Sequence, residues 1–327
     1  MIKKHCMLAA MGLLALAPLQ AAQSTGQAVQ ITTSFSILEN IVHDLLGPQA
    51  QTVAVKTLVG LNQNSHTYQL RATDVQTMQT SNLMVFNGLG FESAALQRAA
   101  QNTKRATVMA GDGLHDLLHG HDEHGDDHDH AAETAAEHAE HAHEHEHEAH
   151  DHGDGGLDPH VWLDPLNMPA YTGNITKALM QQQPEKKAQY ALSWQLYQLK
   201  LAHLHGENVR LLAPIPLAKR KVLTSHAAFA YMGRRYQIEF FAPIRGGHEA
   251  EASAKTLVDL IHQVKAEHIQ AVFVENVNDT RLLEQLSRET GVSIQGKLYS
   301  DALSSDAPDY FQFYRHNIAA LVKALQH

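Results

Sequence analysis

Short apolar runs alternate with amphipathic helical patterns along the chain, and the alternation occurs in two blocks. The runs in the first block cover residues 29–35, 52–58, 83–87 and 106–109, and those in the second cover 221–225, 238–241, 271–275 and 292–298. Strand-length runs separated by helices are typical of parallel sheets, because parallel strands need a helix-sized crossover between them. The sequence therefore predicts an α/β fold with two parallel-sheet lobes.

One long amphipathic segment at residues 185–212 separates the two blocks. Large apolar side chains recur there at spacings of three or four, with Asn208 interrupting the stripe; they are Tyr190, Trp194, Tyr197, Leu201, Leu204 and Leu211. This spacing predicts a single rigid helix that joins the lobes and ends near Pro214. Such a connection opposes a wide clamshell motion.

The first 22 residues have the pattern of a secretory signal peptide, with two lysines, an apolar run at 6–19, and small residues at the predicted cleavage site near 21 or 22. A membrane anchor is the alternative, but this run is shorter than the roughly 20 apolar residues that span a bilayer. Cys6, the only cysteine, lies too early to be a lipidated residue at the cleavage site. Any metal in the mature protein must then bind nitrogen and oxygen. We expect a first lobe at 23–184, the linking helix at 185–212 and a second lobe at 213–327.

A histidine-rich tract at residues 115–152 lies inside the first lobe. It holds 13 of the 25 histidines: His115, His119, His121, His124, His128, His130, His138, His141, His143, His145, His147, His150 and His152. Imidazole suits zinc and its first-row neighbours, whereas a purely carboxylate tract would suit calcium or magnesium. The tract has no apolar periodicity, so we interpret it as a disordered loop that binds metal in an auxiliary role. A solvated acidic linker is the plainer alternative.

Acidic residues also gather in this region, where residues 113–156 hold 14 of the 35 and contain neither lysine nor arginine. The formal charge of -10 thus belongs to the tract, and the rest of the chain is mildly basic. Because no basic run carries interleaved aromatic residues, the sequence does not indicate a nucleic-acid partner.

Four residues outside the tract are candidate metal ligands, and each follows a predicted strand or lies in a polar turn. They are His66, His160, His226 and Asp301. Asp158 or Asp164 could orient the His160 imidazole as a hydrogen-bond acceptor. Glu275, at the end of a predicted strand, could support a ligand histidine or form an ordinary salt bridge. We expect five further histidines to be solvated on the surface, namely His203, His205, His248, His262 and His268.

Several motifs carry a resemblance to a known family; they are 33–35 (TSF), 66–68 (HTY), 87–92 (NGLGFE), 158–162 (DPHVW), 224–229 (TSHAAF) and 301–303 (DAL). With them the chain resembles the zinc-uptake solute-binding proteins of metal ABC transporters, the ZnuA-like (cluster A-I, TroA-like) family, over essentially its whole mature length. The resemblance implies two lobes joined by one long helix, with one metal held in the cleft between them by His66, His160, His226 and Asp301.

The resemblance also bears on which metal is bound. Three imidazoles and one carboxylate form a nitrogen-rich set that zinc accepts readily in tetrahedral geometry. Manganese-binding relatives carry a second carboxylate at the position of His226, as expected for a harder ion. A histidine-rich loop between the first two histidine ligands is also common in the zinc-specific members. One departure is the pair Asn64 and Ser65, where many relatives have an acidic residue, so we expect Asp301 to bind directly.

The function implied is high-affinity capture of Zn(II) in the periplasm and delivery to an inner-membrane ABC permease with its ATPase. The protein is then a monomeric receptor and not an enzyme, and a periplasmic zinc chaperone is a further partner compatible with this function. The alternatives are a periplasmic metal buffer or chaperone acting through the histidine-rich loop, and a manganese-type receptor. A zinc hydrolase is disfavoured, because the chain has no H-E-x-x-H helix and four protein ligands close the coordination shell.

Overall fold

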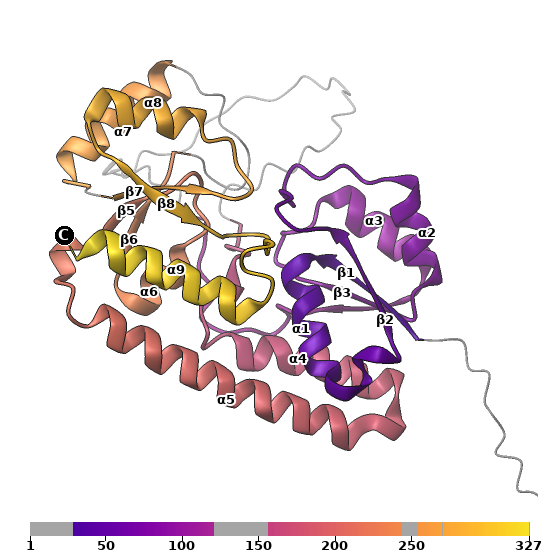
Figure 1. Cartoon of the computed structure of the whole chain (residues 1–327). Coiled ribbons are helices and arrows are strands. Elements are labelled where there is room, and N and C mark those ends of the chain that lie inside the picture. The colour runs from indigo at the N-terminus through magenta and orange to yellow at the C-terminus, as the bar shows by residue number, and fades with distance from the viewer. Residues whose placement is uncertain (1–28, 121–155, 244–253, 270, 327) are drawn as a thin grey trace, which may run out of the picture.

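The computed structural model describes residues 29–120, 156–243, 254–269 and 271–326 (Figure 1). The predicted signal peptide, most of the histidine-rich tract and His248 lie outside these residues. None of the described helices is both long enough and apolar enough to span a membrane.

The first lobe contains a four-stranded parallel sheet in the order β2-β1-β3-β4. Its strands are β1 (Gln30–Phe35), β2 (Ala54–Val59), β3 (Leu83–Phe86) and β4 (Ala106–Met109). The helices around it are α1 (Ser36–Leu46), α2 (Ala72–Thr80), α3 (Ala94–Thr103) and α4 (Met168–Gln182). Every residue of β3 is buried, as expected for a central strand with helices on both faces.

The second lobe repeats this topology in the order β6-β5-β7-β8, again all parallel. Its strands are β5 (Lys221–Leu223), β6 (Glu239–Phe241), β7 (Ala271–Glu275) and β8 (Ile294–Leu298). Its helices are α6 (Ala230–Tyr236), α7 (Ala254–Ala266), α8 (Arg281–Thr290) and α9 (Tyr310–Leu325). The predicted fold of two parallel-sheet lobes is confirmed, and each predicted strand end lies within two residues of the observed one.

Helix α5 (Lys187–Leu212) runs beneath both lobes and packs against α1 and α4 of the first and α9 of the second (Figure 1). Its 26 residues give a length of about 39 Å. Short 3₁₀ helices lie at Gly47–Gln51, Val161–Leu163, Pro184–Lys186 and Leu217–Lys219.

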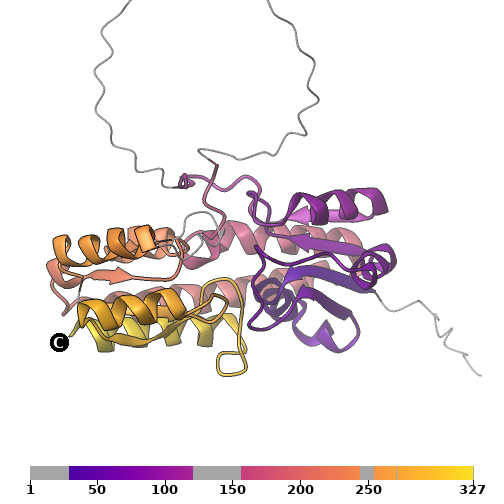
Figure 2. The ribbon, with the colours of Figure 1, turned by 90° about the horizontal axis from the view of Figure 1, so that it is seen from above.

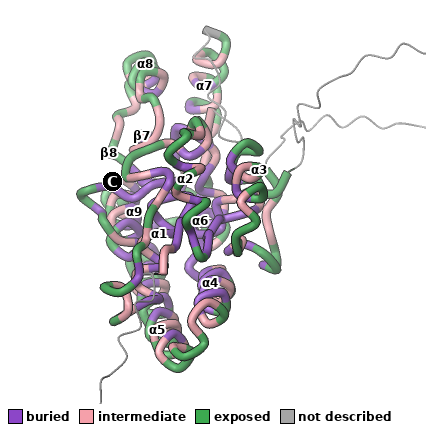
Figure 3. Tube along the Cα trace, turned by 90° about the vertical axis from the view of Figure 1, so that its right-hand side faces the viewer, coloured by how far each residue is buried: buried purple, intermediate pink, exposed green. Residues whose placement is uncertain are grey.

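The predicted apolar stripe of α5 is wrong at its C-terminal end. Leu211 is 49% exposed, whereas Asn208 is buried and donates a hydrogen bond of 3.0 Å from Nδ2 to the Tyr236 hydroxyl. The helix therefore continues its buried face through Asn208 to Leu212, because a buried amide is tolerated once its hydrogen bond is made. Figure 3 shows exposed residues along the outer side of α5.

One buried apolar cluster extends through both lobes, and it includes Ile31 of β1, Trp162, Tyr197 of α5 and Phe273 of β7. Two smaller clusters lie under the outer helices, one beneath α2 and α3 and the other beneath α7 and α8. The view from above shows the two lobes side by side, each with helices on both sides of its sheet (Figure 2). Because the lobes share buried surface, a large separation between them would expose apolar area.

Candidate metal centre

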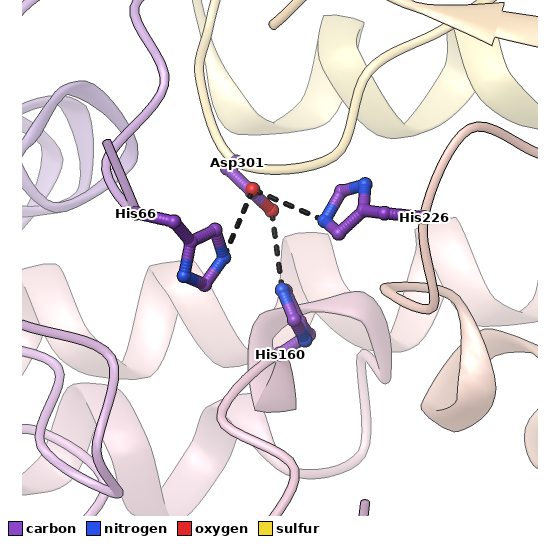
Figure 4. A group of neighbouring side chains, drawn as sticks. All are labelled: His66, His160, His226 and Asp301. Atoms are coloured by element: carbon purple, nitrogen blue, oxygen red, sulfur yellow. Dashed lines mark ion pairs between the residues drawn. The ribbon is translucent and has the colours of Figure 1, made fainter. Parts of the chain in front are cut away.

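The four candidate ligands come together between the lobes (Figure 4). His66 lies in the loop after β2, His160 directly before the 3₁₀ turn at Val161–Leu163, His226 after β5, and Asp301 after β8. One nitrogen from each imidazole and one Asp301 oxygen all lie within 4.8 Å of one another. The carboxyl ends of parallel strands meet at one edge of a sheet, which brings the loops of His66, His226 and Asp301 to one place, whereas His160 reaches it from the segment before Val161–Leu163.

Asp301 occupies the middle of the group. Its Oδ2 lies 3.4 Å from His66 Nε2 and 3.3 Å from His226 Nε2, and its Oδ1 lies 3.4 Å from His160 Nε2. Charge-assisted hydrogen bonds are shorter, at about 2.7–2.9 Å. The three Nε2 atoms and both Asp301 oxygens are buried without a hydrogen-bond partner. Buried polar atoms are rarely left unpaired, so five converging unpaired atoms indicate a site shaped for a cation.

The His160 ring is oriented by Asp158. Asp158 Oδ1 accepts a 2.9 Å hydrogen bond from the His160 backbone N–H and lies 2.7 Å from Nδ1. With the proton on Nδ1, the opposite nitrogen Nε2 presents a lone pair to the centre. Of the two acceptors proposed from the sequence, Asp158 is the one beside the ring, and Asp164 instead forms a paired salt bridge with Arg235.

The His226 ring is supported in the same way from the second lobe. Glu275 Oε1 accepts a 2.9 Å hydrogen bond from the His226 backbone N–H, and Oε2 lies 2.7 Å from Nδ1. The sequence left open whether Glu275 supports a histidine or forms an ordinary salt bridge. Its buried carboxylate faces Nδ1, so Nε2 is the nitrogen left toward Asp301.

His66 is held by its own loop and by an aromatic wall. Asn64 Oδ1 accepts a 2.8 Å hydrogen bond from the His66 backbone N–H, which fixes the turn before the ring. The Phe91 ring meets the His66 ring edge to face at 5.1 Å and also contacts Trp162 at 4.9 Å. This apolar side of the centre excludes water and strengthens the electrostatic interactions within it.

The charges of the site depend on burial and on the carboxylates. Burial lowers the pKa of His66, which favours the neutral, metal-binding imidazole. Burial also opposes the charged form of His226, but the carboxylates of Glu275 and Asp301 outweigh it and raise that pKa well above its usual value. Burial would raise the pKa of Asp301, yet His226 and His160 hold it well below its usual range. Asp301 is therefore ionised at neutral pH.

The remaining predicted residues do not join this centre. His203 is exposed and pairs with Glu207, while His262 and His268 are exposed, as predicted for surface positions. The prediction for His205 is wrong, because this residue is half-buried, with Nδ1 3.3 Å from the Tyr236 hydroxyl. Of the tract, His115 and His119 are described, and the other 11 histidines lie outside the described residues.

Asn278 and Phe91 were not singled out from the sequence. Asn278 Nδ2 lies 2.8 Å from His226 Nδ1, and Phe91 contacts His66. Asn278 comes three residues after the last residue of β7, so the strand-end argument that found Asp301 could have found it. The Phe91 motif was recognised only as part of the family resemblance.

Comparison with known proteins supports the resemblance. Residues 31–324 match the family model described as zinc-uptake complex component A, periplasmic. The metal ABC transporter substrate-binding lipoprotein SloC of Streptococcus mutans is 23% identical over 98% of this chain and 97% of its own length. The manganese-binding lipoprotein MntA of Halalkalibacterium halodurans is 25% identical over 92% of this chain and 89% of its own length.

Solved structures share the fold. The periplasmic zinc-binding protein TroA from Treponema pallidum matches with a TM-score of 0.76 and 22% identity, covering 91% of this chain and 99% of that one. A manganese-bound periplasmic metal-binding protein from Candidatus Liberibacter asiaticus matches with a TM-score of 0.72 and 23% identity, with the same coverage. At these identities the structural likeness is evidence for the fold, and the function must be argued from the site.

Proposed function

The chain belongs to the family of zinc-uptake complex component A periplasmic proteins, and from this membership we propose that it captures Zn(II) and delivers it to an ABC permease. Without specifying the metal, the chain is a metal-binding, substrate-binding protein of an ABC transporter and not an enzyme. Such a receptor acts in the periplasm or at the cell surface and works with a membrane permease and its ATPase.

The observation that carries the proposal is the set of three unpaired imidazole nitrogens around one unpaired carboxylate. We propose His66, His160, His226 and Asp301 as the zinc ligands, with Asp158 and Glu275 orienting two of the rings. Matching relatives are named for zinc and for manganese, so the choice of ion rests on the donors. Three nitrogens and one oxygen favour zinc, whereas manganese prefers a larger share of oxygen.

The parts of the chain outside the described residues have proposed roles in the same function. Residues 1–22 would direct export and be removed. The histidine-rich tract would gather ions weakly for the centre between the lobes. We propose the same domain limits as before, with a first lobe at 23–184, a linking helix at 185–212 and a second lobe at 213–327. We also propose that the receptor is a monomer.

Deleting residues 121–155 should leave one tight zinc site while removing the weaker ones. The Gly120 N–H donates a 2.8 Å hydrogen bond to the Gly156 carbonyl, and His119 pairs with Leu157 in an antiparallel bridge. An Asn-Gly pair can therefore join Gly120 to Gly156 as a two-residue hairpin turn without displacing either end. Titration against a competing chelator gives the number and strength of the sites in the deletion and in the full chain.

A metal buffer that acts through the tract gives the opposite result in this titration. It predicts that tight binding disappears with residues 121–155 and survives substitutions at the four proposed ligands. To cover the two described tract histidines, the deletion should also be made with His115→Ala and His119→Ala. Loss of the tight site from this variant, with normal binding by His226→Ala in the full chain, would contradict the proposed receptor.

Zinc affinity should fall as the pH is lowered, and the protonation of His226 should determine how steeply it falls. Because its pKa is raised well above the usual value, His226 carries a proton in the ion-free protein at neutral pH, and zinc must displace that proton from Nε2. His66, with a lowered pKa, is already neutral. Below the His226 pKa, the affinity should drop about tenfold per pH unit, and above it the dependence should vanish. Calorimetry in buffers of different ionisation enthalpy should give about one proton released per zinc at pH 7.

Glu275→Gln provides the matched control for this measurement. The neutral amide removes one of the two carboxylates that raise the His226 pKa, so fewer protons should be released at pH 7. Binding by the unaltered protein that is independent of pH between about pH 6 and pH 8 would contradict a protonated His226.

A further inference from the structure

Four asparagines from two facing loops form hydrogen bonds across the gap between the lobes, beside the metal centre. Asn62 and Asn64 follow β2 in the first lobe, and Asn276 and Asn278 follow β7 in the second. Asn64 Nδ2 donates a hydrogen bond to Asn278 Oδ1, and Asn276 Nδ2 donates one to Asn62 Oδ1. Each donor–acceptor distance is 3.0 Å. We call these four residues the amide clasp.

The clasp is connected to the ligands at both ends. On the first lobe, Asn64 Oδ1 accepts from the backbone N–H of His66, so the same side chain fixes the ligand's turn and reaches across the gap. On the second lobe, Asn278 Nδ2 lies beside His226, 2.8 Å from the Nδ1 atom that faces Glu275 Oε2. Asn276 Nδ2 also donates to the carbonyl of Ala302, the residue after Asp301.

The backbone beside the clasp adds one more contact between the lobes. Asn62 adopts a left-handed conformation with φ of 53°, which asparagine tolerates better than most residues. In this conformation its N–H donates a 2.9 Å hydrogen bond to the carbonyl of Leu303, two residues after Asp301. The loop that carries His66 is therefore bound to the segment that carries Asp301.

The His160 segment is fastened to the second lobe by a different set of contacts. Trp162 Nε1 donates a 2.8 Å hydrogen bond to the Ser300 carbonyl, and the Tyr310 hydroxyl donates a 2.8 Å hydrogen bond to the Trp162 carbonyl. The Tyr231 hydroxyl donates a 3.1 Å hydrogen bond to the Asp158 backbone carbonyl, and Arg235 forms a salt bridge with Asp164. Asn87 Nδ2 also holds this segment from the first lobe, through the Pro159 carbonyl.

These contacts divide the ligands into a group of three and a single residue. His226 and Asp301 belong to the second lobe, and His160, although part of the first, is attached to the second by the contacts above; all three side chains are at most 3% exposed. His66 belongs to the first lobe, and its side chain is the most exposed of the four at 12%. The hydrogen bonds that carry its loop to the second lobe are those of the clasp and the Asn62 backbone.

We propose that the amide clasp holds His66 closed over a bound ion and thereby sets how long the ion stays. The inference rests on the proposed capture of zinc at this centre. An arriving ion meets His160, His226 and Asp301, and closure of the 60–67 loop adds His66 and completes the shell. Neutral amide hydrogen bonds suit this task, because each is weak enough in water to break during release and directional enough to restore one geometry. The asparagines are positioning residues and do not bind the ion.

The test is the rate at which zinc leaves the full chain into excess chelator, measured by stopped flow. Asn278→Ala and Asn64→Ser each remove the direct amide contact, and serine keeps a hydroxyl acceptor for the turn before His66. Each should release zinc about five to ten times faster, with an association rate within about twofold of the unaltered protein. The double variant should be little faster than either single one, because both remove the same hydrogen bond. Asn102→Ala, at an exposed position of α3, is the matched control.

Two different failures can be told apart in this experiment. If the unaltered protein holds zinc tightly and both variants release it at the unaltered rate, the clasp is wrong and the receptor stands. A purely structural role would appear as a lower melting temperature of the zinc-free variants without faster release, and this outcome also overturns the clasp. If the unaltered protein has no tight site, the proposed function itself fails and the clasp fails with it.

Discussion

Asp301→Asn should lower the affinity for zinc by at least about a hundredfold. Binding free energies of about 10–16 kcal/mol are typical of four-ligand zinc sites, which is about 3 kcal/mol per ligand. Asparagine keeps the size and shape of Asp301 but removes its charge and replaces one of its two oxygens with an amide N–H donor. The loss should exceed this average share, because Asp301 faces all three imidazoles and is the single anion among the proposed ligands.

The histidine variants give the comparison that makes this result specific. His66→Ala, His160→Ala and His226→Ala each remove one donor, and each should lose tight binding to a similar extent. His262→Ala, an exposed histidine on α7, should bind as the unaltered protein does. Affinity is measured by competition with a chelator in the variant that lacks residues 121–155, so that the tract cannot mask the loss. Tight binding that persists in Asp301→Asn and in two of the three alanine variants would overturn the assignment.

The strands and three of the four converging residues were predictable from the sequence because they follow local rules, whereas His160 was predicted from the motif at 158–162. Buried parallel strands read as short apolar runs, and their carboxyl ends are where an α/β lobe exposes functional side chains. The packing of α5 was not predictable in the same way. Asn208 is buried because Tyr236 happens to offer its hydroxyl, and Leu211 is exposed because the buried side of the helix passes through Leu212. Only tertiary contacts decide such positions.

Partners from distant parts of the chain were the hardest to foresee. Asp158 is two residues from His160, and the sequence could propose it, whereas Asn64 and Asn278 are 214 positions apart. An asparagine in a loop has many plain explanations, so neither residue carried a signal alone. The pairing became visible only when the two lobes were placed against each other, which is why the residues that connect the lobes were missed while the four converging residues were found.

The shared core limits how the centre can open. Because one buried cluster extends through both lobes, with Trp162 and Tyr310 hydrogen-bonded where they meet, separation of whole lobes would expose large aromatic surface. Opening by the loop that carries His66 needs only the amide hydrogen bonds and the Asn62 backbone contact to break. The proposed release therefore requires only a local motion of the loop that carries His66.

Replacing His226 with glutamate, together with Glu275→Gln, should shift the ion preference away from zinc and toward manganese. The change gives two nitrogens and two carboxylates, a harder donor set. Glutamate at position 226 alone would bring a third carboxylate into the buried space that Glu275 and Asp301 already share, and repulsion would raise its pKa. The glutamine at 275 removes that conflict and can still accept a hydrogen bond from the backbone N–H of residue 226.

The measured quantity is the ratio of the zinc and manganese affinities, obtained by competition of each ion against the same chelator. Zinc should lose about a hundredfold with the imidazole nitrogen, while manganese loses little, so the ratio should fall by at least about tenfold. Zinc should still bind more tightly in absolute terms, because it follows manganese in the affinity order of divalent ions at a given site. Glu275→Gln alone is the control, and it keeps all four proposed ligands. An unchanged ratio in the double variant would mean that His226 does not contact the ion, since a change of donor at a bound ligand must alter the preference between a borderline and a hard cation.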